Sequence, residues 1–407
     1  MKNNITIVIS RLNGISGGAE RIYCELANML ARNGNSVTCF TYDKPGGEPF
    51  YSLDDNVKRI TAGNCKRDFK TRLKSIVYKF LPKRFELRDR LRWHGRNDHR
   101  IARLREHLQA EQPDIVISLL PPANTITLLA AKDLPLKVIA TNHSVPEQDY
   151  ATERWGGGMY ARKLRLAALD RADAIHVLFP SFKNWFPEHL RDRIVAIPNH
   201  IPDDFASSDR SELPREKIVL GVGRLTDVKS YMTLVQAWSL IEAERDGWTL
   251  KICGEGGERG NLEDFIQEKG LSSSITLAGA VSDIKREYQK ASIFCHPAKF
   301  EGFGLSVVEA LACGLPVVAF EDTPGLKEYL KDGENALLAQ RHPDQTEALA
   351  LKLKSLMVNS ELRECLSQNA PASVQHFSTT TYEARWLKLI GDVTHSDCPT
   401  ESLGTAE

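Results

Sequence analysis

The residue types best suited to chemistry are two glutamates that flank a glycine-containing loop, Glu301 and Glu309, in the run Glu-Gly-Phe-Gly-Leu-Ser-Val-Val-Glu. Residues 305–313 are expected to form a helix directly behind this loop. The first backbone N–H groups of a helix have no partner inside it, and with the helix dipole they attract phosphate. We therefore expect the two carboxylates to contact different parts of one phosphate-bearing ligand. The alternative is a pair of surface carboxylates beside an ordinary helix.

A second candidate site is the run Gly-Val-Gly-Arg-Leu-Thr-Asp-Val-Lys at residues 221–229. A predicted strand ends there in glycines, and two cations, Arg224 and Lys229, follow in the loop. Two fixed cations suit a diphosphate that must leave with negative charge, because they stabilise that charge as the bond breaks. No Asp-x-Asp pattern stands out as a metal site, so we expect a metal-independent reaction without a cofactor. The alternative is that both are solvated loop cations.

Further candidates follow predicted strands in the first half of the chain. Gly17 and Gly18 open a predicted helix, where glycines allow a ligand to approach the backbone. The nearby Glu20 occupies the position of a helix-capping carboxylate and is interpreted as structural. His143 follows a strand predicted at 137–140 and is a candidate donor to a ligand hydroxyl, although a lone histidine is more often an ordinary loop residue.

Small residues also follow two predicted strands in the second half of the chain. Gly254 comes after a strand at 249–253, and Ala280 and Val281 come after a strand at 275–277. Main-chain groups at such positions can contact a ligand or read the edge of a base. Each motif is weak alone, but the carboxyl ends of parallel strands share one sheet edge and so converge on one crevice.

These residues require a scaffold of alternating strands and helices, and the sequence pattern predicts one. Short β-branched runs, typical of buried parallel strands, alternate with helical periodicity, which is typical of doubly wound α/β domains. Strands are predicted at 5–9, 37–41, 115–119, 137–140, 174–177, 194–197, 218–222, 249–253, 275–277, 293–295 and 316–320. In the second half, helices are predicted at 231–243, 259–269, 284–291, 305–313, 344–358, 361–369 and 381–390.

The chain is longer than one hydrophobic core usually fills, so two domains are expected. The Asp-, Ser- and Pro-rich stretch around 203–214 is interpreted as a linker. We place one Rossmann-like domain at 1–202, a second at 203–375, a last helix at 376–394 and a flexible tail at 395–407. Two such domains can clamp a substrate in a cleft between them.

Charge is neutral over the 407 residues, with 53 basic and 53 acidic side chains, but it is unevenly placed. Residues 66–105 hold fifteen Lys or Arg and four acids, a net charge of +11, with apolar residues interleaved at helical spacing. This pattern indicates a helix or helical hairpin on an anionic membrane surface. No nucleic-acid-binding module accompanies it, so no nucleic-acid partner is expected. A solvated helical face is the remaining alternative.

The composition, 42% hydrophobic and 26% charged, is ordinary for a globular protein. Eight scattered cysteines without Cys-x-x-Cys spacing indicate reduced thiols. No run approaches the ~20 apolar residues that span a bilayer, and the apolar part of the start is too short for a signal peptide. We therefore expect a cytoplasmic protein held peripherally at the inner face of the cell membrane.

Together, these motifs resemble those of the family 4 retaining glycosyltransferases of GT-B fold, in the right order and over nearly the whole chain. The resemblance rests on Glu301 and Glu309, on the Gly-Arg-Leu…Lys run at 223–229, on Gly-Gly-Ala-Glu-Arg at 17–21, and on Pro-Asn at 198–199. It implies an α/β fold of two doubly wound Rossmann-like domains facing across a cleft, with the acceptor side in the first domain. The carboxyl-terminal helix would cross back to brace that domain.

The resemblance also implies a role for each motif. Glu301 would contact the donor sugar near the reacting carbon, Glu309 would bind the ribose, and His143 would assist from the opposite domain. The departing phosphate would take the acceptor's proton in a front-face attack, so no side chain need act as a general base. The implied catalytic residues are Glu301, Lys229, Arg224 and His143. The expected donor-binding residues are Gly17, Gly18, Arg224, Lys229, Gly254, Ala280, Val281, Glu301, Phe303, Gly304, Leu305 and Glu309.

The implied activity is transfer of a hexose or N-acetylhexosamine from a nucleotide sugar, expected to be a UDP-sugar, to a lipid-linked or glycan acceptor in polysaccharide biosynthesis. Two alternatives remain: a nucleotide-sugar epimerase or phosphorylase on the same fold, and a catalytically silent membrane adaptor. The chain departs from the family pattern at Ser230, where glycine is common, and at His200, where glycine or proline is common.

Overall fold

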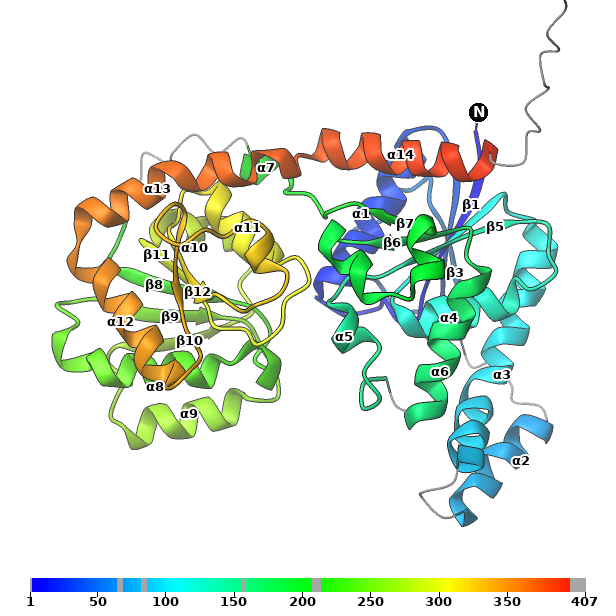
Figure 1. The fold of residues 1–407 in the computed structure, drawn as a ribbon, viewed down its shortest axis with the longest axis horizontal. Coiled ribbons are helices and arrows are strands. Elements are labelled where there is room, and N and C mark those ends of the chain that lie inside the picture. Colours follow the sequence, from blue (N-terminus) through cyan, green and yellow to red (C-terminus); the bar gives the residue numbers. More distant parts are fainter. Residues whose placement is uncertain (1, 64–68, 82–85, 156–157, 207–213, 396–407) are drawn as a thin grey trace, which may run out of the picture. The chain divides into compact units, whose positions relative to one another are not determined.

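A computed structural model describes residues 2–63, 69–81, 86–155, 158–206 and 214–395 (Figure 1). The predicted tail at 395–407 lies outside this part of the chain except for its first residue, and so do some residues of the basic segment 66–105. The chain divides into two compact units, Met1–Ile197 with Glu383–Glu407, and Pro198–Tyr382. Each unit is described by itself.

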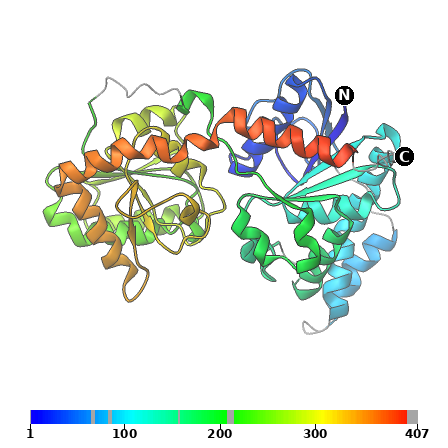
Figure 2. The ribbon, with the colours of Figure 1, turned by 45° about the horizontal axis from the view of Figure 1, so that its top comes forward.

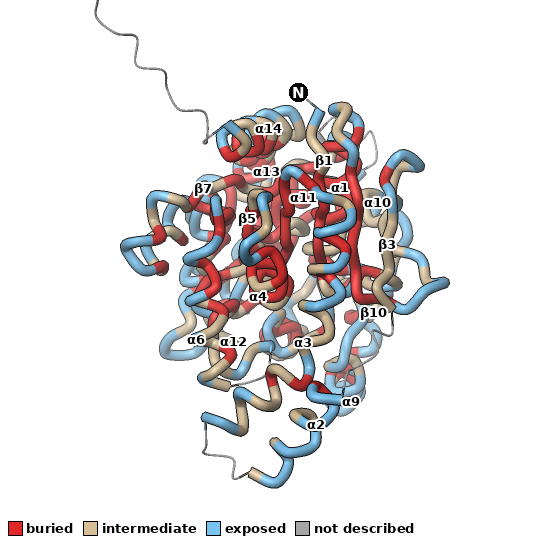
Figure 3. The backbone as a smooth tube through the Cα atoms, turned by 90° about the vertical axis from the view of Figure 1, so that its right-hand side faces the viewer, coloured by how far each residue is buried: buried red, intermediate tan, exposed pale blue. Residues whose placement is uncertain are grey.

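The first unit is built on a sheet of seven parallel strands in the order β3-β2-β1-β4-β5-β6-β7. All residues of the central strands β1 and β4 except Asn4 are buried, as the β-branched runs predict (Figure 3). The register places Ile5 of β1 beside Val37 of β2 and Ile115 of β4. The strands are β1 (Asn4–Ile9), β2 (Ser36–Thr41), β3 (Lys58–Thr61), β4 (Ile115–Leu119), β5 (Lys137–Thr141), β6 (Ala174–Val177) and β7 (Ile194–Ala196).

Helices connect these strands, and two of them carry most of the basic segment. The helices are α1 (Gly18–Arg32), α2 (Phe69–Val77), α3 (Glu86–Glu111), α4 (Pro121–Ala130), α5 (Pro146–Asp149) and α6 (Gly158–Ala168). Figures 1 and 2 show α2 alongside α3. The two helices approach so closely at Gly95 that no side chain fits there. A Cβ at this position would lie 2.8 Å from the backbone nitrogen of Ser75. The described part of the segment is therefore a pair of packed helices.

The second unit repeats the architecture with six parallel strands in the order β10-β9-β8-β11-β12-β13. Its strands are β8 (Ile218–Val222), β9 (Thr249–Cys253), β10 (Ile275–Gly279), β11 (Ile293–His296), β12 (Val317–Phe320) and β13 (Ala336–Ala339). Its helices are α7 (Asp203–Ala206), α8 (Tyr231–Ile241), α9 (Arg259–Glu268), α10 (Ile284–Lys290), α11 (Leu305–Ala312), α12 (Gln345–Val358) and α13 (Ser360–Val374). The predicted fold class, doubly wound α/β in both halves, is confirmed.

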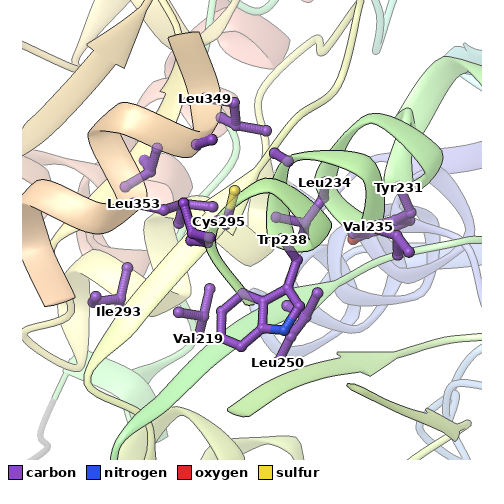
Figure 4. Packing of buried hydrophobic residues seen from close by; sticks show 14 of the residues in the cluster. Val219, Tyr231, Leu234, Val235, Trp238, Leu250, Ile293, Cys295, Leu349 and Leu353 are labelled. Carbon is purple, nitrogen blue, oxygen red and sulfur yellow. The ribbon is translucent and has the colours of Figure 1, made fainter. Parts of the chain in front are cut away.

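The core of the second unit packs one face of its sheet against α8 and α12. Figure 4 shows Trp238 of α8 among Val219, Leu250 and Ile293 of three strands, with Leu353 of α12 nearby. The indole nitrogen of Trp238 donates to the hydroxyl of Ser274 at 3.1 Å, so its polar atom is satisfied in the core. This packing fixes α8 directly behind the loop that carries Arg224 and Lys229.

The last helix, α14 (Thr379–His395), begins in the second unit and ends in the first. Within the first unit, Trp386 is fully buried and its ring lies 5.0 Å from that of His176 in β6. Glu383 accepts a hydrogen bond from the side-chain amide of Asn33, which follows α1. The carboxyl-terminal part of α14 is thus an integral part of the first unit.

Two strands of the structure differ from the sequence predictions. The edge strands β3 and β13 were not predicted, because β3 is only partly buried and β13 is a short Ala-Leu-Leu-Ala run without β-branched residues. The described helices include none with the length and apolar content needed to cross a membrane.

Candidate active site

The loop between β11 and α11 carries the predicted phosphate site. Gly304 adopts a φ of 79° just before α11 begins, and a Cβ there would lie 2.7 Å from Leu326 and 2.9 Å from the hydroxyl of Tyr329. Only glycine meets both demands. The carbonyl of Glu301 accepts from the backbone N–H of Gly325 at 3.0 Å, which holds the loop from behind. The first N–H groups of α11, beginning at Leu305, have no partner within the helix.

Glu301 lies at the centre of a charged cluster in this loop. Its Oε2 accepts a hydrogen bond from Nζ of Lys229 and one from Nε2 of His296 at 3.0 Å. The side chains of Glu301 and Lys229 are 16% and 20% exposed, so the ion pair is largely withdrawn from water. Glu301 Oε1 accepts only a 3.3 Å bond from the adjacent N–H of Gly302 among the described residues. One carboxylate oxygen therefore holds the cation while the other has capacity for a ligand.

The cluster fixes the protonation states of its members. Burial alone would raise the pKa of Glu301, but the charge of Lys229 and the hydrogen bond from His296 hold that pKa well below its usual range. Burial, together with the charge of Lys229, lowers the pKa of His296. At neutral pH the site thus holds a carboxylate at Glu301 and a neutral imidazole at His296. Glu301 is consequently unsuited to act as a proton donor.

Main-chain contacts position the loop that carries Lys229. Residues Asp227–Lys229 form a 3-10 turn, and Ser230 follows with a left-handed φ of 54° at the start of α8. The N–H of Lys299 donates to the carbonyl of Val228 at 2.9 Å, and Nζ of Lys299 pairs with Asp227 at 2.7 Å. Glycine is common at this position in the family whose motifs the chain resembles, because glycine adopts a left-handed φ without strain.

Glycines line the sheet edge beside this loop. The N–H of Gly223 donates to the carbonyl of Cys253 at 3.0 Å, and that of Gly254 donates to Gly279 at 2.7 Å. A Cβ on Gly254 would lie 2.0 Å from the carbonyl oxygen of Gly223, so no larger residue fits. The ends of three adjacent strands, β8, β9 and β10, are therefore packed backbone against backbone.

The remaining predicted donor-binding residues of this unit are spread around the same edge. Arg224 is exposed, and among the described residues its side chain has no hydrogen bond or ion pair. Ala280 and Val281 follow β10, with Ala280 exposed and Val281 half-buried. Phe303 is buried. The structure thus places these residues after the carboxyl ends of β8, β10 and β11. The strand order reverses between β8 and β11, where open α/β sheets bind ligands, whereas β10 is the edge strand.

Glu309 makes a hydrogen bond to a different helix. It is buried in α11, and its Oε2 accepts from the hydroxyl of Tyr288 in α10 at 2.9 Å. Burial and the neighbouring carboxylate raise the pKa of Tyr288 well above its usual value, so this tyrosine stays a hydrogen-bond donor. The ribose contact of Glu309 stays a prediction.

The predicted residues of the first unit lie at the carboxyl ends of its own strands. Gly17 caps α1 and is buried, and Gly18 is the first helical residue. A Cβ on Gly17 would lie 2.1 Å from the carboxylate of Glu20, which places that glutamate over the helix start, as the capping interpretation expects. His143 follows β5, and its Nε2 lies 2.9 Å from the hydroxyl of Thr141.

Two family models match the chain, one after the other. Residues 16–205 match the model described as Glycosyltransferase Family 4, and residues 204–373 match the one described as Glycosyl transferases group 1. The Glu301 cluster lies wholly inside the second match. The chain belongs to glycosyltransferase family 4.

Relatives and solved structures agree with this family 4 assignment over nearly the full length. The chain is 27% identical over 391 residues to a Campylobacter jejuni alpha-1,4-N-acetyl-D-galactosaminyltransferase acting on GalNAc-alpha-(1->4)-GalNAc-alpha-(1->3)-diNAcBac-PP-undecaprenol, covering 96% of this chain and 98% of that one. It is 23% identical over 389 residues to the amylovoran biosynthesis glycosyltransferase AmsD of Erwinia amylovora, covering 93% and 98%. The structure of the pneumococcal O-GlcNAc transferase with UDP and GlcNAc superimposes with a TM-score of 0.74 at 15% identity, covering 97% and 99%. The shared fold is GT-B.

The sequence analysis of this family 4 glycosyltransferase missed two residues of the site. His296 ends β11 five positions before Glu301, and its Nδ1 is buried without a partner among the described residues. The hydroxyl of Tyr231, the first residue of α8 (Figure 4), is likewise buried without a described partner and lies beside Gly223 and Lys229. A histidine at the carboxyl end of a predicted strand was a usable signal. Tyr231 resembles an ordinary core residue in sequence.

Proposed function

We propose that the chain transfers a hexose or N-acetylhexosamine from a UDP-sugar, with retention of anomeric configuration, to a lipid-linked or glycan acceptor in polysaccharide biosynthesis. The observation that carries this proposal is the cluster of Glu301, Lys229 and His296 beside the start of α11, at the reversal point of the second sheet. The relatives named for a lipid-diphosphate-linked acceptor and for amylovoran biosynthesis support the acceptor class and pathway.

In this proposal the donor diphosphate lies between the start of α11 and the loop that carries Arg224 and Lys229. The ammonium of Lys229 and the exposed guanidinium of Arg224 meet the charge that develops on the departing diphosphate. No metal is needed for this charge, and the described residues contain no group of three potential ligands for one. UDP is the proposed nucleotide because a structural neighbour was solved with it.

The proposed assignments extend to the rest of the donor. Oε1 of Glu301 accepts a hydrogen bond from a hydroxyl of the donor sugar. The backbone N–H groups of Gly304 and Leu305 donate hydrogen bonds to the sugar and the phosphate. Ribose binding is assigned to Glu309 and base contact to the backbone at 280–281. From the first unit, Gly17, Gly18 and His143 contribute to donor or acceptor binding.

The proposed chemistry needs no side-chain base. The acceptor hydroxyl attacks the anomeric carbon on the face that the diphosphate leaves, the bond from that carbon to the phosphate oxygen breaks, and the departing phosphate oxygen takes the hydroxyl proton. Because Glu301 remains ionised, it stabilises positive charge on the sugar rather than donating a proton.

A membrane-docking role for α2 and the 3-10 turn that follows it, Tyr78–Phe80, is part of the same proposal. The side chains of Phe69 and Phe80 are 79% and 83% exposed, and the exposed Lys70, Arg72 and Lys79 lie among them. An apolar, basic helix face suits the surface of an anionic membrane, where a lipid-linked acceptor resides. We accordingly propose a peripheral location at the inner face of the cell membrane.

The function is tested by incubating the full chain with UDP- and GDP-sugars and a polyprenyl-diphosphate-linked acceptor in anionic vesicles, with and without EDTA. A glycosylated lipid that keeps the donor's anomeric configuration by NMR, unchanged by EDTA, is the expected product. An inverted linkage would contradict retention. An epimerised donor or a sugar 1-phosphate without transfer would instead establish the epimerase or phosphorylase alternative.

One variant arm of the same assay tests the membrane. Replacing Phe69 and Phe80 by serine is expected to lower binding to anionic vesicles at least tenfold, because each phenylalanine contributes roughly 1.5–3 kcal/mol when buried. Transfer to a soluble, short-chain acceptor should not change. Leu351→Ser, at an exposed position of α12, is the matched control. Unchanged vesicle binding by the double variant would contradict the docking role of α2 and the turn after it.

A further inference from the structure

A hollow of about 500 Å³ lies in the first unit, at the carboxyl ends of β1 and β4. The strand order of the sheet reverses between these two strands, since β2 flanks β1 on one side and β4 flanks it on the other. Open α/β sheets bind ligands at such reversal points. The hollow is therefore at the position in the first unit that corresponds to the Glu301 site in the second.

The charge of the hollow is one-sided. Five arginines line it, and none of the described lining residues is acidic. Three of the arginines, Arg92, Arg96 and Arg100, are spaced four residues apart and so share one face of α3. Arg11 arrives from the end of β1, and Arg165 from α6. Three segments that are distant in sequence thus bring positive charge to one place, beside Leu120, which follows β4.

The carboxylates nearest to these arginines form their ion pairs with other side chains. Nε of Arg92 and Nε of Arg165 are buried without a hydrogen-bond partner among the described residues, although Arg165 is only 3% exposed. Asp98, the acid on α3 nearest in sequence to these arginines, is engaged by Lys74 at 2.5 Å and by His94 at 2.6 Å. Buried Asp149, whose charge also acts on Arg165, pairs with Arg154 at 3.6 Å. Nη2 of Arg165 donates to the carbonyl of Ala151 at 2.9 Å, which leaves its positive charge in place. Guanidinium groups clustered in this way repel one another and favour a multivalent anion.

The hollow also has a rigid, partly apolar wall. Leu120 adopts a φ of 75°, a strained conformation for leucine, and its N–H donates to the carbonyl of Thr141 at 3.1 Å. Strained backbone that the surrounding structure maintains is concentrated at ligand sites. Trp93 is buried in the wall, and Trp155 donates its indole N–H to the carbonyl of Asp149 at 3.2 Å. Aromatic rings beside arginines suit a ligand that joins phosphate to an apolar or sugar group.

We propose that this hollow binds the diphosphate of the lipid-linked acceptor through Arg92, Arg96 and Arg165. The assignment rests on the glycosyl transfer proposed above and names the acceptor group that the first unit recognises. Planar guanidinium groups bind phosphate oxygens in pairs, and several around one hollow match two linked phosphates better than one. The donor diphosphate is assigned to Arg224 and Lys229 in the second unit, so the two diphosphates have separate cations.

The test is calorimetric titration of the full chain with farnesyl diphosphate, inorganic pyrophosphate, farnesol and UDP. Wild type should bind farnesyl diphosphate and not farnesol. The variant Arg92→Gln/Arg96→Gln should bind farnesyl diphosphate and pyrophosphate at least tenfold more weakly, since each lost charged hydrogen bond weakens binding about tenfold or more. Its affinity for UDP should not change, which also shows that it is folded.

The matched control is Arg103→Gln, on the same helix but outside the hollow, where Arg103 pairs with Glu106. Wild-type affinity for farnesyl diphosphate in Arg92→Gln/Arg96→Gln would overturn the proposal, as would equal losses in the control. Loss of binding to anionic phospholipid vesicles with intact diphosphate binding would also overturn it, in favour of a headgroup site. Absence of UDP binding by wild type would count against the proposed function alone, because pyrophosphate and farnesyl diphosphate report on the hollow independently.

Discussion

Replacing Glu301 by glutamine is expected to slow sugar transfer roughly 10²–10³-fold while leaving the protein folded. Glutamine keeps the shape of the side chain but removes the charge that accepts hydrogen bonds from both Lys229 and His296. Without it, Lys229 loses its anchor and the donor sugar loses a charged acceptor. The measurement is kcat at saturating donor, with circular dichroism and thermal unfolding as checks of the fold.

The control for this variant is Glu361→Gln, which removes an exposed carboxylate from the first turn of α13. It should turn over at the wild-type rate. If Glu301→Gln transfers sugar as fast as wild type, Glu301 is not part of the reacting site. If it is slow only because it is unfolded, the loss of the far-ultraviolet signal reveals this, and Glu301→Asp then serves as the second variant.

Lys229→Met is expected to impair both stability and donor binding. The substitution leaves the largely buried carboxylate of Glu301 with a neutral imidazole as its hydrogen-bonding side chain. We expect the free energy of unfolding to fall by roughly 2–4 kcal/mol, near the low end for buried pairs because both side chains keep some exposure. UDP affinity should fall at least tenfold, since a cation facing the diphosphate is lost. Urea unfolding and calorimetry measure the two effects.

The double variant Lys229→Met/Glu301→Gln separates these effects. Removing both charges should restore most of the lost stability, because no unpaired buried charge remains, while transfer stays at least as slow as in Glu301→Gln. Lys331→Met, which removes an exposed lysine paired with Glu334, is the matched control. A double variant no more stable than Lys229→Met would show that the ion pair does not govern stability here. If Lys229→Met binds UDP as tightly as wild type, Lys229 does not contact the donor.

The fold and the donor-site loops could be predicted because their signals are local. The β-branched runs at 115–119 and 174–177 coincide with β4 and β6. The run Glu-Gly-Phe-Gly predicts a loop that is followed by the start of a helix. Glycines at 254 and 304 are required by close approach and by a left-handed φ, respectively. Such demands act within a few residues and therefore leave a mark in sequence.

Features that depend on tertiary contact could not be predicted in the same way. The two glutamates were expected to reach different parts of one ligand, yet only the fold shows Glu301 bound by Lys229 and His296 while Glu309 faces Tyr288. Similarly, the basic segment suggested a membrane surface as a whole. In the structure, α2 exposes its apolar residues, whereas the arginines of α3 share a hollow with Arg11 and Arg165. The spacing of these arginines along the sequence does not indicate that they line one hollow.

The most direct test of the central claim, that the second unit holds the nucleotide of the donor, is hydrogen–deuterium exchange of the full chain with and without saturating UDP. We predict slower exchange in peptides covering 221–231 and 301–309, where the Lys229 loop and the start of α11 meet UDP. Peptides covering 92–100 of α3 should exchange at unchanged rates. Unchanged exchange at 221–231 and 301–309, or protection confined to the first unit, would contradict this account of the donor site.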